Sequence, residues 1–185
     1  MSVNSILFYR EGDLTLAQTP QRLTTVSRVN VKPFSCKNLD MVVPECVSGD
    51  MWTERKFREL FSGGFDADLL TRNCLETPCI GVSTFGIAKR RITGHDAFQD
   101  FVVPPHVLCL SIQQIGLWCE INKKNLTSRC STSAFIFLFL GQNDKVKLVM
   151  VNNEVAGLTL YSTFLDHRDN SFNSCGINVV VVPLH

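Results

Sequence analysis

The chain has 185 residues, of which 45% are hydrophobic and 19% are charged. That length accommodates one domain with a hydrophobic core and leaves little room for a second, and the composition excludes a disordered or low-complexity chain. With 18 Lys and Arg against 17 Asp and Glu, the formal net charge is +1, which excludes the strong cationic excess that nucleic-acid binding draws on. We therefore predict a single globular domain, residues 1–185, that does not bind nucleic acid.

The sequence disfavours both export and membrane insertion. Residues 1–10 have no basic flank, no apolar stretch of sufficient length and no small-residue cleavage site, so we expect an intracellular chain whose eight cysteines are reduced. The longest apolar run is residues 134–140, whereas a membrane-spanning helix needs about 20 residues. We expect this run to be a buried strand, and the protein to be soluble and to have no membrane partner.

The first elements along the chain are short predicted strands at residues 5–10, 14–18 and 23–31. Apolar and polar side chains alternate in part through these segments, and a turn at Glu11-Gly12-Asp13 separates the first two. The first forty or so residues are therefore expected to be β structure.

A helical hairpin is predicted at about residues 50–76. From Asp50, which can cap a helix, apolar side chains follow at i, i+3 and i+4, namely Phe57, Leu60 and Phe61. Gly63-Gly64 ends this first helix, and a second short helix is predicted to follow it and to end before Pro78.

The remainder of the chain is predicted to be β structure. Valine, isoleucine and phenylalanine are concentrated in short segments separated by turns, at residues 81–87, 101–103, 107–121, 134–140, 146–151, 158–164 and 177–182. The spacing of the turns is typical of a sandwich or a barrel. The sequence thus predicts a mainly β fold, a sandwich or barrel, with the helical hairpin inserted.

The chain lacks the sequence signatures of a phosphate or metal site. It contains neither a Gly-x-Gly-x-x-Gly nor a Gly-x-x-x-x-Gly-Lys-Ser/Thr motif. Cys74 and Cys79 have no second close-spaced pair to complete a zinc site. His106 and Cys109 are three residues apart in an expected strand, where such side chains point to opposite faces. We therefore predict no metal and no cofactor.

Two polar segments are candidate catalytic sites. His95 lies in Thr93-Gly94-His95-Asp96, a pattern typical of a polar turn. Asp166-His167-Arg168-Asp169 places carboxylates beside an imidazole, but its composition is typical of a solvated loop between two strands. Because the chain also lacks a Gly-x-Ser-x-Gly elbow, no catalytic residue is predicted.

The start of the first predicted helix is the candidate protein-binding surface. Met51 and Trp52 lie there between acidic neighbours, with Glu54 and Phe57 following on the helix. Tryptophan and methionine are enriched at the centres of protein interfaces. The alternative is that Trp52 packs into the core instead.

Three later segments share a pattern. Residues 100–112 join an apolar strand, the Pro104-Pro105 turn and a second apolar strand; residues 146–153 end an apolar strand in Asn152-Asn153; and residues 175–183 form a closing apolar run. This succession resembles the dUTPase family, and residues 7–12 are similar to the dUTPase-related early proteins of adenoviruses, to which herpesvirus proteins are also related. The resemblance implies a viral source and a dUTPase-like β-barrel or sandwich.

The parts with which the dUTPase family carries out its chemistry do not match this chain. A dUTPase has a Gly-x-x-Asp-x-x-Tyr hairpin, an Arg-Ser-Ser phosphate contact, an Arg-x-Ala-Gln strand and a Gly-rich C-terminal arm. Here residues 141–145 lack the Tyr and the correctly spaced Asp, residues 176–179 replace Arg-x-Ala-Gln, and the sequence ends at Leu184-His185. Without a water-activating carboxylate and phosphate donors, neither base catalysis nor charge stabilisation is expected.

The sequence therefore predicts a non-catalytic viral accessory protein, not an enzyme, that binds host proteins in the cytoplasm or nucleus of the host cell. It leaves homo-oligomerisation open. The alternative is an enzyme, either a divergent nucleotide hydrolase that uses residues 166–169 or a Cys/His hydrolase. A capsid or other structural β protein is disfavoured because the N-terminus lacks a basic arm.

We expect the purified protein to release no pyrophosphate from dUTP or other nucleoside triphosphates in the presence of Mg²⁺. The residues that would activate water and hold the phosphates are missing from the matching segments. A pyrophosphate-release assay measures this activity directly. Release that disappears in an Asp166→Asn or Asp169→Asn variant would contradict the expectation and favour the hydrolase.

Overall fold

The computed structural model describes residues 30–36, 38–47, 54–62, 76–87, 92–127, 132–141, 144–155, 157–166 and 177–184. The strands in these ranges are β1 (Val31–Pro33), β2 (Val42–Val43), β3 (Ile80–Ile87), β4 (Thr132–Leu140), β5 (Val146–Glu154), β6 (Gly157–Phe164) and β7 (Ile177–Pro183). The helices are α1 (Glu54–Leu60), α3 (Gly94–Phe98), the 3-10 helix η1 (Pro105–Leu108) and α4 (Ile112–Thr127).

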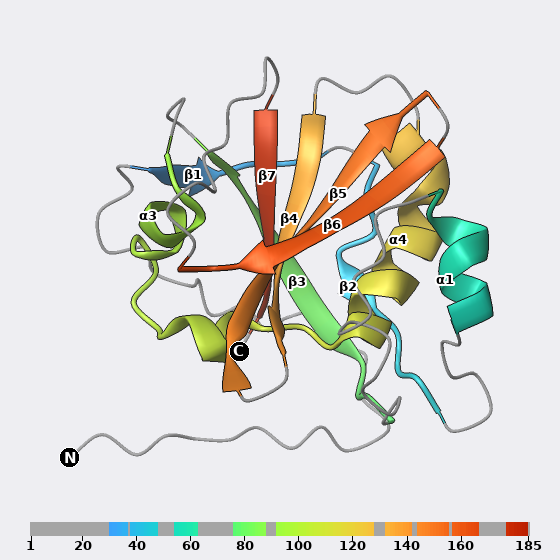
Figure 1. Ribbon diagram of the computed structural model, residues 1–185, viewed down its shortest axis with the longest axis horizontal. Helices are drawn as coiled ribbons and strands as arrows, with labels where there is room; N and C mark the ends of the chain where they lie inside the picture. The colour runs from blue at the N-terminus through green and yellow to red at the C-terminus, as the bar shows by residue number, and fades with distance from the viewer. Residues whose placement is uncertain are drawn as a thin grey trace, which may run out of the picture.

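The described strands form one open, mixed sheet (Figure 1). Its order is β1-β3-β7-β4-β5-β6. β1 pairs with the last residues of β3, and β2 pairs with the first residues of β3. β4 and β7 run parallel at the centre, and the other neighbouring strands are antiparallel. Because β5 and β6 form a hairpin beyond β4, the last strand of the chain returns to the centre of the sheet.

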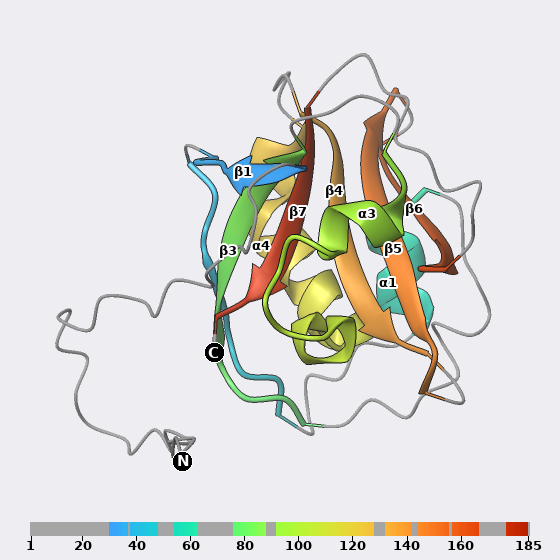
Figure 2. The same cartoon turned by 90° about the vertical axis from the view of Figure 1, so that its left-hand side faces the viewer.

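Helices cover both faces of the sheet: in Figure 2, α3 lies in front of the strands and α4 and α1 lie behind them. α4 and α1 pack on one face and α3 and η1 pack on the other, so the sheet separates two hydrophobic cores. Side chains of β4 enter these cores alternately: Phe135, Phe137 and Phe139 face α4, whereas Ile136 and Leu138 face α3 and η1. A strand buried on both faces has an unbroken apolar sequence, which explains the apolar runs of β4 and β7.

The chain crosses from one face of the sheet to the other at Cys109. Leu108 lies in the core beneath α3, whereas Leu110 lies in the core beneath α4. Pairing between β4 and β7 ends at Ile136 and Val180, and beyond that point the backbone N–H of Leu110 donates to the carbonyl oxygen of Leu138 at 2.8 Å. The crossing segment thus donates a hydrogen bond to the part of β4 that no longer pairs with β7.

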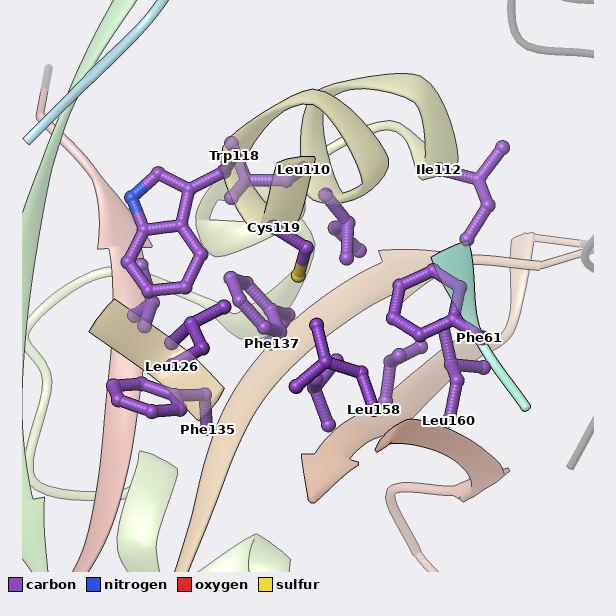
Figure 3. Close-up of a cluster of buried hydrophobic side chains, with 14 of the residues drawn as sticks. Phe61, Leu110, Ile112, Trp118, Cys119, Leu126, Phe135, Phe137, Leu158 and Leu160 are labelled. Carbon is purple, nitrogen blue, oxygen red and sulfur yellow. The ribbon is translucent and has the colours of Figure 1, made fainter. Parts of the chain in front are cut away.

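α4 starts directly after this crossing because its first turn is capped. The hydroxyl of Ser111 accepts from the N–H of Gln114 at 3.1 Å, and the side-chain carbonyl of Gln114 accepts from the N–H of Ser111 at 2.9 Å. This is the reciprocal capping box, which satisfies two backbone donors at a helix start. α4 then buries Trp118 against Phe135 and Phe137, with ring centroids 5.5 and 5.4 Å away (Figure 3).

Polar side chains of α4 hold the segment that precedes β2. The buried amide of Asn122 accepts from the N–H of Asp40 at 2.7 Å and donates to its carbonyl oxygen at 3.2 Å. The indole N–H of Trp118 donates to the same oxygen at 3.0 Å, and Asn125 donates to the carbonyl of Asn38. The helix thereby gives the segment the hydrogen bonds that a neighbouring strand would otherwise supply.

A buried carboxylate holds the start of β1 in the same manner. Asp100, 3% exposed, accepts from the N–H groups of Asn30 and Val31 at 2.6 and 3.0 Å. The Asn30 side chain also donates to the carbonyl oxygen of Asp96 at 3.0 Å. Charge-assisted hydrogen bonds of this kind are among the stronger ones in proteins, so this edge of the sheet is fastened to the α3 segment.

Most of the strands predicted for the described residues are confirmed, and the fold is mainly β. The strands predicted at residues 81–87, 134–140, 146–151, 158–164 and 177–182 lie within β3, β4, β5, β6 and β7. The first helix of the predicted hairpin is confirmed as α1. The second falls mainly on residues 63–75, which lie outside the described residues, as do the predicted strands at 5–10 and 14–18 and most of the one at 23–31. The last residue of that strand, Val31, begins β1.

The strand prediction for residues 107–121 is wrong, because this stretch contains the end of η1 and more than half of α4. Its isoleucine and leucine content suggests a strand, but the buried side chains of Ile112, Ile115, Trp118 and Cys119 repeat at helical spacing. Residues 101–103 also form no strand. The predicted sandwich or barrel is corrected in turn: the described residues form one open sheet, because helices cover its faces.

Replacing Asn122 with alanine is expected to destabilise the fold by about 2–3 kcal/mol, because the N–H of Asp40 loses its acceptor and the carbonyl oxygens of Asp40 and Trp118 each lose a donor. Asn153→Ala, on the exposed end of β5, is the matched control and should change stability by less than about 0.5 kcal/mol. Urea unfolding followed by circular dichroism measures both. Equal unfolding midpoints for the two variants would show that the hydrogen bonds of Asn122 contribute nothing to stability.

Candidate functional site

The residues predicted to bind a partner are placed only in part. Met51 and Trp52 lie outside the described residues. Glu54 is the first residue of α1, and its side chain is not described. Phe57 is 2% exposed and stacks on Phe61 with ring centroids 5.7 Å apart, inside the core beneath α4. The Phe57 ring therefore stabilises the core, and the binding role of the helix start stays a prediction.

The polar candidates lie on the surface. His95 is exposed on α3, where its Nδ1 atom is 3.1 Å from Nε2 of Gln99. Asp166 is also exposed, and residues 167–169 lie outside the described ranges. His106 is exposed too, and the thiol of Cys109 donates to the carbonyl of Pro105 at 3.5 Å.

Two thiols are held in their protonated form. Burial raises the pKa of Cys109 from 9.0 to about 12 and raises that of Cys119 as well. The thiolate is the nucleophilic form of cysteine, so neither side chain is suited to attack a substrate at neutral pH. Within the described ranges, Cys79, Cys109 and Cys119 have free thiols.

An exposed group of side chains lies at the end of the β5–β6 hairpin. It consists of Glu154, Val155 and Tyr161, which we call the hairpin patch. Val155 is fully exposed in the turn, and Tyr161 on β6 is 42% exposed. Figure 1 shows this turn at the upper right, where β5 and β6 meet at the outer end of the sheet. The patch thus presents an aliphatic and an aromatic side chain to a partner.

The strand register places the polar members of this patch together. Glu154 pairs with Gly157, so Glu154, Thr159 and Tyr161 lie on one face of the sheet, the face that α3 covers nearer the centre. Gly157 has a φ of 121°, a conformation that glycine adopts freely, and it closes the short turn against Glu154. The side chains are therefore positioned by regular strand pairing.

Hydrogen bonds fix the two large side chains of the patch relative to each other. The hydroxyl groups of Thr159 and Tyr161 both donate to Oε1 of Glu154, at 3.0 and 3.2 Å. Exposed carboxylates and tyrosines otherwise exchange among several rotamers, and ordering them on binding costs free energy. Here part of that cost is met within the free chain.

Other exposed apolar side chains are more scattered. Those in the described ranges are Val42, Val47, Val102, Ile121 and Phe164. Single apolar residues on a surface are ordinary, and the Phe164 ring is already in contact with Lys145 and Lys147, whose Nζ atoms are 5.6 and 5.0 Å from its centroid. The hairpin patch differs because an exposed aromatic ring, an exposed valine and a fixed carboxylate occur together.

The sequence predicts both strands of the hairpin but not this patch. The only signal is Val155 itself, since short hairpin turns favour glycine, asparagine and aspartate. An aliphatic residue in such a turn gains nothing from the turn conformation. The contact of Tyr161 with Glu154 could not be anticipated, because it depends on the register of the two strands.

Three broader observations complete the description of the site. In the part of the chain that the structure describes, no three His, Cys, Asp or Glu side chains are grouped so that they could hold a metal ion. The same part contains no helix that is long and apolar enough to cross a membrane; α4 has 16 residues. Comparisons with protein-family models, with curated proteins and with solved structures found no match to this chain.

Cys109 and Cys119 are expected to resist alkylation in the native protein, whereas the exposed Cys79 should be modified readily. A pKa of about 12 leaves only about one Cys109 thiol in ten thousand ionised at pH 8, and raising the pH towards 12 should increase its reactivity as long as the fold persists. Iodoacetamide labelling followed by peptide mass spectrometry measures each site. In urea all should react alike, and native labelling of Cys109 as fast as Cys79 would contradict the assignment.

Proposed function

We propose that the chain is a non-catalytic binding protein that engages another protein through the hairpin patch of Glu154, Val155 and Tyr161. The observation that carries this proposal is the combination of a fully exposed Val155 with an exposed Tyr161 whose hydroxyl is fixed by Glu154. Tyrosine is enriched among the residues that contribute most to interfaces. A ring held in place also loses less conformational freedom when it binds.

The energetics of such a contact are favourable for a modest interface. Burying the Val155 side chain in an apolar pocket of a partner would contribute about 1.5–3 kcal/mol. Tyr161 adds a larger apolar area with a polar hydroxyl at its edge. β5 and β6 belong to a sheet that is packed on both faces by hydrophobic cores, so these contacts form with little rearrangement of the scaffold.

The proposed biological setting is that of a viral accessory protein that binds host proteins in the cytoplasm or nucleus of the host cell. It rests on the sequence likeness of residues 146–153 and 175–183 to dUTPase-related viral proteins. Residues 107–112, which carry part of the likeness, are helical at both ends instead of extended, and this weakens the likeness.

Two observations support the proposal that the chain is not an enzyme. The sequence lacks the matching parts of a dUTPase active site, and the raised pKa values of Cys109 and Cys119 disfavour a Cys/His hydrolase that would use either thiol.

Val155→Asp is expected to reduce capture of the host partner at least tenfold, because a charged side chain cannot enter an apolar pocket without a large desolvation cost. The measurement is quantitative mass spectrometry of proteins recovered from host-cell lysate with the wild-type chain and with the variant. Val155 is fully exposed, so circular dichroism melts of the variant and the wild type should coincide.

Val102→Asp is the matched control. Val102 is also an exposed valine, at 60%, but it follows α3 on a different part of the surface. Proteins lost from Val155→Asp and retained by Val102→Asp would be partners of the hairpin patch. Recovery of the same proteins in the same amounts with wild type and Val155→Asp would contradict the proposed function.

A further inference from the structure

One oxygen of the Glu154 carboxylate is available to a partner group that donates hydrogen bonds. Both intramolecular bonds, from Thr159 and Tyr161, go to Oε1. Among the described residues no group donates to Oε2. Glu154 itself is exposed, so this second oxygen faces solvent while the first is anchored. A carboxylate fixed in this way offers a donor a single, defined direction of approach.

Glu154 carries the charge of the hairpin next to its turn. No other charged residue lies between positions 148 and 165 of the sequence. Lys145, just before β5, and Lys147, within it, belong to the opposite end of the hairpin, where Lys147 pairs with Phe164. Lys147 and Glu154 are seven positions apart along the strand, which is about 23 Å, so these two lysines do not neutralise Glu154.

We propose that the protein partner presents an arginine to the hairpin patch. Its guanidinium group would donate to Oε2 of Glu154 and lie against the exposed ring of Tyr161, while apolar neighbours of that arginine would cover Val155. Arginine suits this pair of groups because it is planar, donates in a fixed fork and stacks on aromatic rings. A lysine ammonium is more strongly hydrated and lacks the planar face.

This inference rests on the proposed function and names the chemistry of the partner at the same site. The test is a random peptide library displayed on phage, selected on the full chain and counter-selected on the Val155→Asp variant. We expect the peptides that depend on Val155 to contain an arginine next to apolar residues. Changing that arginine to lysine in a synthetic peptide should weaken binding at least fivefold.

Glu154→Gln tests the receiving side. A glutamine keeps a carbonyl oxygen for the hydroxyl groups of Thr159 and Tyr161 but removes the charge. Binding of the selected peptides should fall at least tenfold in this variant and lose most of its dependence on salt. Asp144→Asn is the control, because Asp144 is an exposed acidic residue at the other end of β5 whose φ of 56° asparagine also adopts; its peptide binding should be unchanged.

The outcomes separate the two proposals. Val155-dependent peptides without arginine, or peptides that bind wild type and Glu154→Gln equally well, would overturn the arginine inference and leave the binding role of the hairpin patch in place. Failure to select any peptide that distinguishes the wild-type chain from Val155→Asp would overturn both.

Discussion

The burial of both faces of the two central strands is the constraint on which the described fold depends. β4 and β7 present apolar side chains in both directions, so neither face of the sheet centre can be left in water. A single hydrophobic layer would cover only one of them. The chain meets this requirement by placing α4 and α1 on one side and α3 and η1 on the other.

Covering both faces requires the chain to pass from one side of the sheet to the other, and it does so where β4 and β7 separate. Leu108 and Leu110 enter opposite cores, and the N–H of Leu110 replaces the hydrogen bond that β7 no longer makes. The capping box of Ser111 and Gln114 then starts α4 directly after the crossing. The passage thus gives the carbonyl oxygen of Leu138 a hydrogen-bond donor, as a buried edge requires.

The hairpin patch lies where this constraint ends. β5 and β6 extend past the region that α3 covers, so the side chains on that face near the turn are free to serve binding instead of packing. Glu154 and Tyr161 are ordered by each other and by Thr159, while the buried residues of the same strands, such as Leu148 and Leu160, anchor the hairpin in the two cores. A rigid scaffold with an exposed end is a common arrangement for recognition surfaces.

The sequence by itself determined most of the strands, because alternating or unbroken apolar patterns such as residues 134–140 report local periodicity. It also located α1 through the spacing of Phe57, Leu60 and Phe61. Ser111-x-x-Gln114 and the helical spacing of Ile115, Trp118 and Cys119 are also local signals, and they indicate α4 in place of the predicted strand. Tertiary structure alone decided two matters. Whether Phe57 faces a partner or the core depended on where α1 packs. The meeting of Glu154 with Tyr161 depended on strand register, which brings together residues seven positions apart and which no local pattern encodes.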